Sequence, residues 1–254
     1  MKIELSGTGT NITFQSPDNE RILYAGLKSS PELPYECATG TCGSCKAKCI
    51  EGSFEWVWSE APARKNLKNA DELLMCQCIA TSNLKLEVKS KLVKSALPFS
   101  SATWMDGEIK SFKNLAPGVM SLSIKLQHEI CFLPGQFMVI EFSDVQGGRA
   151  WSMTNFVPGL TDCVDFVIKM KPGGELSNFL FDSHGLDKLL DQSVRVFGPI
   201  GKAVFDENIS RDLVCIAGGT GIASMMSILE AFSKKKNSTN SASLFFGVRT
   251  QEDV

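Results

Sequence analysis

Several features are scarce or absent in this 254-residue sequence, and each absence narrows the range of functions. The opening stretch MKIELSGTGTNITF has no apolar segment behind a basic start, so no secretory signal peptide is predicted. Neither sign of charge dominates, since 26 Lys and Arg stand against 28 Asp and Glu, and this balance argues against nucleic-acid binding. Internal repeats and low-complexity segments are absent as well. We therefore expect a cytoplasmic protein that is long enough for two or three small domains.

Long hydrophobic runs are also scarce, and only one segment invites a membrane interpretation. Residues 213–232, LVCIAGGTGIASMMSILEAF, hold a single charged residue, Glu230, over about the length that a bilayer requires. The GGTG inside this segment and the strand-like LVCIA before it favour a strand, a glycine turn and a helix instead. No membrane span is therefore expected.

Cysteine, in contrast, is abundant, with nine residues in a chain that lacks a predicted signal peptide. Clustered cysteines in a reducing compartment bind metal or carry out redox chemistry more often than they form disulfides. Four of them follow the spacing C-x4-C-x2-C, thirty further residues, then C: Cys37, Cys42, Cys45 and Cys76. This spacing is typical of plant-type [2Fe–2S] centres. Gly40 and Gly43 suit a loop that wraps closely around inorganic sulfide and turns its amide groups inward.

Other interpretations of the cysteines fit less well. Structural zinc prefers two C-x2-C pairs, whereas the second pair here would be Cys76 and Cys78 with the spacing C-x-C. A Rieske centre needs two histidine ligands, but the only histidines, His128 and His184, lie far from the cysteine loop. A disulfide framework conflicts with the expected compartment. The sequence therefore favours a [2Fe–2S] cluster over zinc.

The pattern of strands and helices changes twice along the chain. The first part reads as an α+β unit, with a hairpin at 2–15, a helix in ERILYAGLKSS and a closing strand at 84–88. Strands separated by Gly and Pro turns then predict an antiparallel β-barrel. The last part reads as strand, glycine turn, helix and strand, the opening of a parallel α/β sheet. The expected boundaries are 1–92, a linker at 93–104, 105–207 and 208–254.

The last part contains only two predicted strands before the sequence ends at GVRTQEDV. A parallel α/β domain needs several strands, covered on both faces, to bury its core. We therefore expect 208–254 to be the N-terminal part of a truncated nucleotide-binding domain.

The cysteine region resembles a known family. PYECATGTCGSCKAKCIEGSFE followed by LLMCQCIA is similar to the N-terminal ferredoxin domain of bacterial oxygenase reductases, and the resemblance covers residues 1–90. It implies a β-grasp fold in which Cys76, the first cysteine of CQC, is the fourth cluster ligand. Cys49 and Cys78 would then be spectators, as free buried cysteines usually are.

Two later segments resemble the flavin-binding elements of the ferredoxin reductase family. GGRAWSMTN (147–155) resembles the R-x-Y-S motif, with tryptophan in place of tyrosine. The resemblance implies FAD, with the guanidinium on the pyrophosphate, the indole on the isoalloxazine and the serine hydroxyl as the catalytic group near N5. The residues of this motif are Arg149, Ala150, Trp151 and Ser152. VIKMKPGGELSNFL (167–180) resembles the second element, whose expected cofactor contacts are Ile168, Lys169, Gly174, Glu175, Leu176 and Ser177.

CIAGGTGIASMM (215–226) resembles the family's dinucleotide turn, although Ser224 replaces a proline. The expected NAD(P)H contacts are Gly218, Gly219, Thr220 and Gly221, with NADH favoured over NADPH. The family resemblance implies a monomeric reductase that passes electrons from NAD(P)H through FAD and the cluster to a terminal oxygenase. A deoxysugar-nucleotide reductase and a non-catalytic, metal-stabilised binding module are the alternatives.

Overall fold

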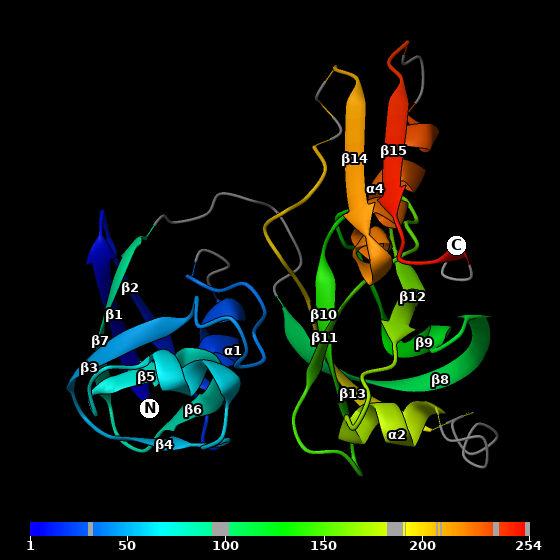
Figure 1. The fold of residues 1–254 in the computed structure, drawn as a ribbon. Coiled ribbons are helices and arrows are strands. Elements are labelled where there is room, and N and C mark those ends of the chain that lie inside the picture. Colours follow the sequence, from blue (N-terminus) through cyan, green and yellow to red (C-terminus); the bar gives the residue numbers. More distant parts are fainter. Residues whose placement is uncertain are drawn as a thin grey trace. The chain divides into compact units, whose positions relative to one another are not determined.

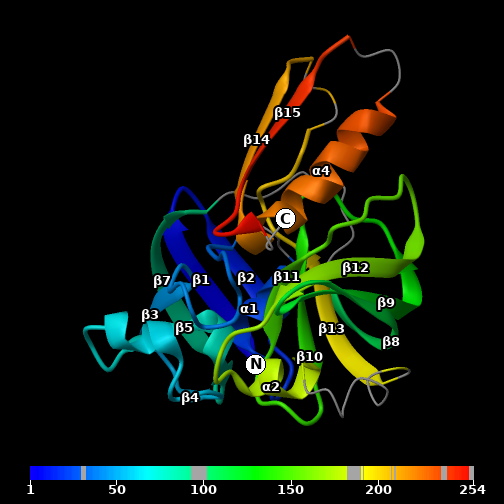
Figure 2. The ribbon, with the colours of Figure 1, turned by 45° about the vertical axis from the view of Figure 1, so that its right-hand side comes forward.

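The computed structural model describes residues 1–29, 33–92, 102–181, 190, 192–206, 208, 210–235 and 239–251. The chain divides into two compact units, Met1–Thr103 and Trp104–Val254, which are drawn in Figure 1 and, from a second direction, in Figure 2. The expected linker at 93–104 lies largely outside the described residues, and its last two residues begin a strand.

The first unit is built on a five-stranded mixed sheet in the order β2-β1-β7-β3-β5. Its strands are β1 (Lys2–Thr8), β2 (Asn11–Gln15), β3 (Lys46–Glu51), β5 (Glu72–Leu74) and β7 (Leu84–Lys91). The predicted hairpin is confirmed, because β1 and β2 pair antiparallel with Ile3 opposite Phe14. The predicted closing strand β7 joins β1 in parallel, so Leu84 lies beside Ile3. Apolar side chains alternate along both strands and point into one core.

Shorter elements bring the cysteine segments against this core. The predicted helix α1 (Ile22–Leu27) is buried along its whole length and packs against η2 (Met75–Gln77) and β6 (Cys78–Ala80). A Cβ on Gly26 would lie 2.3 Å from Leu33 Cδ1, so the helix approaches the following loop as closely as glycine permits. β6 pairs with β4 (Phe54–Trp56), which leads to the 3-10 helix η1 (Pro62–Asn66).

The second unit begins with a six-stranded antiparallel sheet in the order β11-β10-β13-β8-β9-β12. Its strands are β8 (Thr103–Ala116), β9 (Val119–Ile130), β10 (Phe137–Phe142), β11 (Arg149–Ser152), β12 (Thr161–Lys169) and β13 (Ser193–Ile200). The sheet curls into a half-barrel (Figure 2), and its edge strands approach each other at the bridge between Met153 and Phe166. The predicted antiparallel strands are therefore confirmed, and the sheet they form is a curled half-barrel.

One apolar core fills the concave side of the curled sheet. Alternate residues of β9 and β12 supply much of it, and the short helix α2 (Glu175–Phe181) adds Leu176 and Leu180. Three aromatic rings meet in this core beside β11, since the ring centroid of Trp151 lies 6.1 Å from those of Phe142 and Phe166.

The predicted strand–turn–helix–strand unit is also confirmed. β14 (Leu213–Gly218) and β15 (Ala242–Gly247) pair in parallel, and the turn η3 (Gly219–Gly221) leads into α4 (Ile222–Lys234), which covers one face of the pair (Figure 1). Cys215 and Ala217 point toward that helix, whereas Ile216 and Phe245 on the opposite face are 75% and 62% exposed. No helix among the described residues combines the length and apolarity needed to cross a bilayer.

Candidate functional site

The four predicted cluster cysteines come from one loop and one 3-10 turn of the first unit. Cys37 and Cys42 lie in the loop before β3, Cys45 lies directly before that strand, and Cys76 lies in η2. The sulfurs of Cys45 and Cys76 are 3.2 Å apart, although 31 positions separate them in sequence. The amide of Met75 donates to the carbonyl of Cys45 at 3.1 Å, which fixes the two segments side by side. All nine cysteines are free thiols.

Backbone amides point at the sulfurs of this loop. Thr39 and Cys42 each place an N–H within 3.4 Å of the Cys37 sulfur, and Ser44 does the same for Cys42. Left-handed backbone at Ala38 (φ 57°), Gly40 (φ 82°) and Gly43 (φ 84°) turns the amides inward. Amide donors of this kind stabilise thiolate and sulfide charge, so the loop is suited to an iron–sulfur cluster.

Neighbouring elements hold the loop from outside. The buried Tyr24 hydroxyl donates to the Ala38 carbonyl at 2.9 Å, and the Ala63 amide donates to the Gly40 carbonyl at 3.0 Å. A Cβ on Gly40 would lie 2.8 Å from the Gln77 Cγ, so glycine is required by space as well as by its positive φ. The tight loop that Gly40 and Gly43 indicated in the sequence is therefore present. The contact from Tyr24, in contrast, had no recognisable signal in the sequence.

The environment of the loop favours thiolate at two of the cysteines. Burial alone would raise the pKa of Cys37, but hydrogen bonds from the Thr41 side chain and the Thr39 amide outweigh it and lower the pKa to about 6. The hydrogen bond from Cys76 lowers the pKa of Cys45, and the same bond raises the pKa of Cys76 well above its usual value. The shared hydrogen bond thus favours the thiolate form at Cys45 and the protonated thiol at Cys76.

The two cysteines expected to be spectators differ from these. Burial raises the pKa of Cys78 to about 12, which keeps it a neutral thiol. Burial also raises the pKa of Cys49, whose sulfur lies 3.6 Å from the carbonyl of Glu51, away from the loop. Neither residue is prepared to be a thiolate ligand.

The four loop sulfurs fit a two-iron group better than a single ion. They form two pairs, Cys37 with Cys42 and Cys45 with Cys76, each joined by a hydrogen bond. A [2Fe–2S] cluster takes two thiolates on each iron, so two pairs match its requirement.

The expected flavin motif lies on the short edge strand β11. Pairing with β10 places Arg149 opposite Ile140 and Trp151 opposite Met138, so these two side chains share one face of the strand. The Arg149 guanidinium is held at its own turn, because Nη1 donates to the carbonyls of three consecutive residues at 3.1–3.3 Å: Gln146, Gly147 and Gly148. Ser152, half-buried on the other face with Ala150, has no side-chain hydrogen-bond partner within the described residues.

The second expected flavin element spans the end of β12, a turn and the start of α2, and its side chains differ in exposure. Strand alternation buries the Ile168 side chain in the core and exposes the Lys169 side chain on the opposite face. A turn then leads into α2, where the Lys171 amide donates to the Ser177 hydroxyl at 2.8 Å. Leu176 packs into the core, whereas Gly174 and Ser177 are half-buried and Glu175 is exposed. The Leu176 side chain is therefore taken up by the core, so this residue could offer a ligand only its backbone groups.

A cavity of about 550 Å³ joins the curled sheet to the glycine turn. Its lining includes Lys169 and three of the four expected dinucleotide residues, Gly218, Gly219 and Thr220, but none of the R-A-W-S residues. It also includes Arg249 after β15 and three residues of the β8–β9 hairpin that no motif indicated: Leu115, Ala116 and Val119. The hairpin residues carry no sequence signature, because their role follows from the position of the hairpin and not from their chemistry.

Comparison with known proteins agrees with this arrangement. The chain matches the 2Fe-2S iron-sulfur cluster binding domain over residues 6–81, the oxidoreductase FAD-binding domain over 106–205 and the oxidoreductase NAD-binding domain over 215–254. It is 30% identical over 246 residues to the ferredoxin–NAD(+) reductase component of the alkene monooxygenase system of Xanthobacter autotrophicus, covering 95% of this chain and 72% of that protein. The chain belongs to the ferredoxin–NAD(P)(+) reductase family of oxygenase systems.

Further members of the family are equally similar. A ferredoxin–NAD(P)(+) reductase of Metapseudomonas resinovorans is 31% identical over 261 residues, covering 100% of this chain and 74% of the relative. Among solved structures, the ferredoxin reductase in carbazole 1,9a-dioxygenase superposes with a TM-score of 0.82 at 30% identity, over 100% of this chain and 74% of that one. The family predicted from the cysteine and flavin motifs is therefore confirmed.

Proposed function

We propose that the chain is the reductase component of a multicomponent mono- or dioxygenase and carries electrons from NAD(P)H to the terminal oxygenase. The observation that carries this proposal is the union, in one chain, of a cysteine loop suited to a [2Fe–2S] cluster with FAD-binding and NAD-binding domains. Relatives are named as reductase components of alkene monooxygenase and naphthalene 1,2-dioxygenase systems and as the electron transfer component of a xylene/toluene monooxygenase. NADH is the proposed donor, since the Xanthobacter relative is named a ferredoxin–NAD(+) reductase component.

The cluster is assigned to two cysteine pairs, Cys37 with Cys42 and Cys45 with Cys76. Support comes from the amide donors around the first pair and from the lowered pKa of Cys37 and Cys45. Cys49 and Cys78 are proposed to remain protonated spectators, in keeping with their raised pKa. We propose 1–92 as the cluster domain and a β-grasp fold for it, joined by 93–104 to the flavin domain.

FAD, when bound, accepts two electrons together and releases them singly, which is what a one-electron cluster requires of its donor. Residues 105–207 are proposed to form the flavin-binding barrel and 208–254 the nucleotide-binding part. Arg149 is assigned to the pyrophosphate, because a guanidinium presents donors in the fork that two phosphate oxygens accept. Ser152 is assigned to the reacting edge of the flavin, where its unengaged hydroxyl donates a hydrogen bond. Trp151 supplies an aromatic face in place of the usual tyrosine.

The remaining assignments concern the nucleotide and the compartment. Gly218, Gly219 and Thr220 line the 550 Å³ cavity together with Lys169 and are proposed to contact NAD(P)H there, with Gly221 beside them at the helix start. We propose a cytoplasmic monomer, since all nine thiols are free and ligand thiolates require a reducing environment.

The proposal is tested on the purified protein by its colour and its cofactors. We expect iron and acid-labile sulfide at about two per chain, as a [2Fe–2S] cluster requires, and FAD in the released flavin by mass spectrometry. NADH should bleach the flavin absorbance, and addition of an oxygenase partner should reoxidise the chain. A colourless protein that carries zinc and no flavin would refute the proposal, and FMN in place of FAD would refute the flavin assignment.

A further inference from the structure

Two oppositely charged side chains of helix α4 bind both backbone polar groups of one residue, Phe156, at the edge of the curled sheet. The Phe156 amide donates to Glu230 Oε2 at 2.7 Å, and Lys234 Nζ donates to the Phe156 carbonyl at 2.6 Å. Glu230 and Lys234 also form an ion pair of 2.6 Å across one turn of the helix. The Phe156 side chain is buried, and the Lys234 ammonium lies 5.9 Å from its ring centroid. We call Glu230, Lys234 and the backbone N–H and C=O of Phe156 the Phe156 clamp.

The gripped segment is a direct continuation of the flavin motif. Phe156 follows Ser152 by four residues, in the stretch where the chain leaves β11 and turns toward β12. Met153 forms a β-bridge with Phe166 of β12. The side-chain amide of Asn155 donates to the Cys163 carbonyl and accepts from the Asp165 backbone amide, both at 3.0 Å, as a neighbouring strand would. The segment is therefore bonded to β12 and continuous with β11, so a displacement of Phe156 would be passed along four residues of backbone to Ser152.

The other end of the clamp leads to the dinucleotide turn. Gly219–Gly221 leads directly into α4, and Glu230 lies nine residues beyond Gly221, which is about 13 Å along a helix at 1.5 Å per residue. A second anchor lies between these points, because the buried Ser227 hydroxyl accepts from the Gly135 amide at 3.1 Å. A single rigid helix thus connects the glycine turn to the segment that follows the flavin motif.

We infer that Glu230 and Lys234 are positioning residues that align the dinucleotide turn with the flavin motif, an inference that rests on the proposed function. Hydride transfer requires the donor and acceptor atoms to be held near contact, and a displacement of about 1 Å can cost about a hundredfold in rate. The clamp is suited to this task because each charge meets the peptide group of opposite polarity. Carboxylate accepts from the N–H, ammonium donates to the C=O, and the ion pair keeps both side chains in place.

An ion pair that only stabilised the helix would work with either order of the two charges along the helix. The clamp works with one order only, so exchanging the two residues separates the two roles. In the double exchange Glu230→Lys/Lys234→Glu, the ion pair is retained at the same spacing, but ammonium now faces the Phe156 amide and carboxylate faces its carbonyl. Both contacts with the Phe156 backbone become repulsive, whereas the helix loses little, since reversed i,i+4 pairs differ only slightly in stability.

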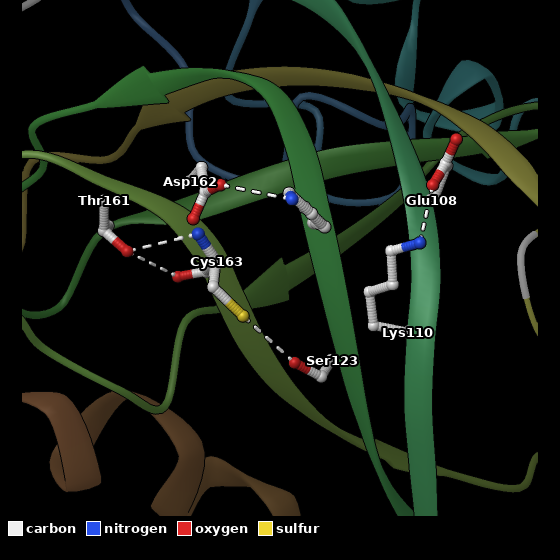
Figure 3. A network of polar contacts seen from close by, with 7 residues as sticks. Glu108, Lys110, Ser123, Thr161, Asp162 and Cys163 are labelled. Carbon is white, nitrogen blue, oxygen red and sulfur yellow. Dashed lines mark hydrogen bonds and ion pairs between the residues drawn. The ribbon is translucent and has the colours of Figure 1, made fainter.

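The experiment compares the wild-type chain with Glu230→Gln, Lys234→Met and the double exchange. The matched control is Glu108→Gln/Lys110→Gln, which removes the exposed 2.7 Å ion pair on β8 drawn in Figure 3, far along the sheet from the motif strand. Three quantities are measured: hydrogen exchange at the Phe156 amide, the rate of flavin reduction at saturating NADH, and the dissociation constant of FAD. Circular dichroism of each variant reports whether the helix is retained.

We expect the clamp variants to exchange the Phe156 amide faster and to reduce flavin about tenfold more slowly, with the double exchange the most affected. FAD affinity should change less than about twofold, because the Arg149 turn is a separate contact. Wild-type behaviour of the double exchange would refute the inference and leave only an ordinary ion pair. Parallel loss of FAD would also refute it, because the clamp would then be a structural support. No flavin reduction in the wild-type chain would instead refute the proposed function, and the positioning role with it.

Discussion

Replacing Tyr24 with phenylalanine should weaken the hold on the cluster without altering any ligand. The Tyr24 hydroxyl is buried and donates to the Ala38 carbonyl at 2.9 Å. Ala38 has left-handed backbone at φ 57°, a conformation that costs a non-glycine residue about 1–2 kcal/mol and therefore needs an external hold. The ring, and the Arg21 guanidinium 5.2 Å from its centroid, should stay in place in the variant.

The Tyr24 hydroxyl also accepts a hydrogen bond from Arg21 Nη1 at 3.3 Å, so the size of the effect is taken from the buried bond to the Ala38 carbonyl. Removing the donor leaves a buried carbonyl without it, at a cost of about 1–3 kcal/mol. Taking about 2 kcal/mol, the population of the inward-turned loop relative to displaced forms falls roughly thirtyfold. Because the Thr39 amide points at the Cys37 sulfur only in the inward form, cluster release to a chelator should accelerate by a similar factor.

The assay is the loss of visible cluster absorbance in the presence of an iron chelator. Ser16→Ala is the matched control, because the Ser16 hydroxyl is buried but has no hydrogen-bond partner among the described residues, so its removal should leave the release rate unchanged. Ala38→Gly, which removes the cost of the left-handed conformation, should restore most of the stability lost in Tyr24→Phe. Equal release rates for Tyr24→Phe and the wild type, or no rescue by Ala38→Gly, would refute the reasoning.

Three further predictions concern the ligands, the flavin and the response to acid. Serine at any of the four proposed ligand positions should abolish or severely disturb the iron–sulfur spectrum, whereas Cys49→Ser and Cys78→Ser should leave it intact; loss only in Cys78→Ser would reverse the assignment. Arg149→Ala should weaken FAD binding by about 2 kcal/mol, or roughly thirtyfold, in a fluorescence titration, because a charge-assisted contact is lost. The ion pair with Lys46 and the Lys68 amide lower the pKa of Glu72 to about 2. The stabilisation from this lowered pKa is complete above the ordinary value of 4.5 and disappears as the pH falls toward 2, so urea midpoints of the wild type and Glu72→Gln should converge over that range.

The sequence was sufficient wherever chemistry depends on spacing along the chain. C-x4-C-x2-C followed by a distant cysteine predicted that Cys45 and Cys76 would meet, and their sulfurs lie 3.2 Å apart. The strand–turn–helix–strand order after residue 208 was likewise readable, because glycines and apolar periodicity mark each element. Strand alternation could also have predicted that the side chains of Ile168 and Lys169 point to opposite faces of β12.

Contacts made through backbone groups left no trace in the sequence. Glu230 attracted notice only as the single charge in an apolar segment, while its partner is a peptide group 74 residues earlier. Any residue at position 156 except proline would offer the same N–H and C=O, so no pattern of side chains could have indicated the contact. Tyr24 is similar, because its partner is the carbonyl of Ala38.

Arg149 illustrates how local structure prepares a site that the motif only names. The three carbonyls of its own turn engage Nη1, and a guanidinium carries five N–H groups. Nη2 and Nε therefore keep the donors that a phosphate pair accepts, so a ligand can bind without breaking the contacts that orient the side chain. The turn offers acceptors because Gly147, at φ +77°, bends the backbone back on itself. Lysine has three donors on one rotating ammonium and could not serve the turn and the proposed pyrophosphate in this divided way, so the proposed role favours arginine at this position.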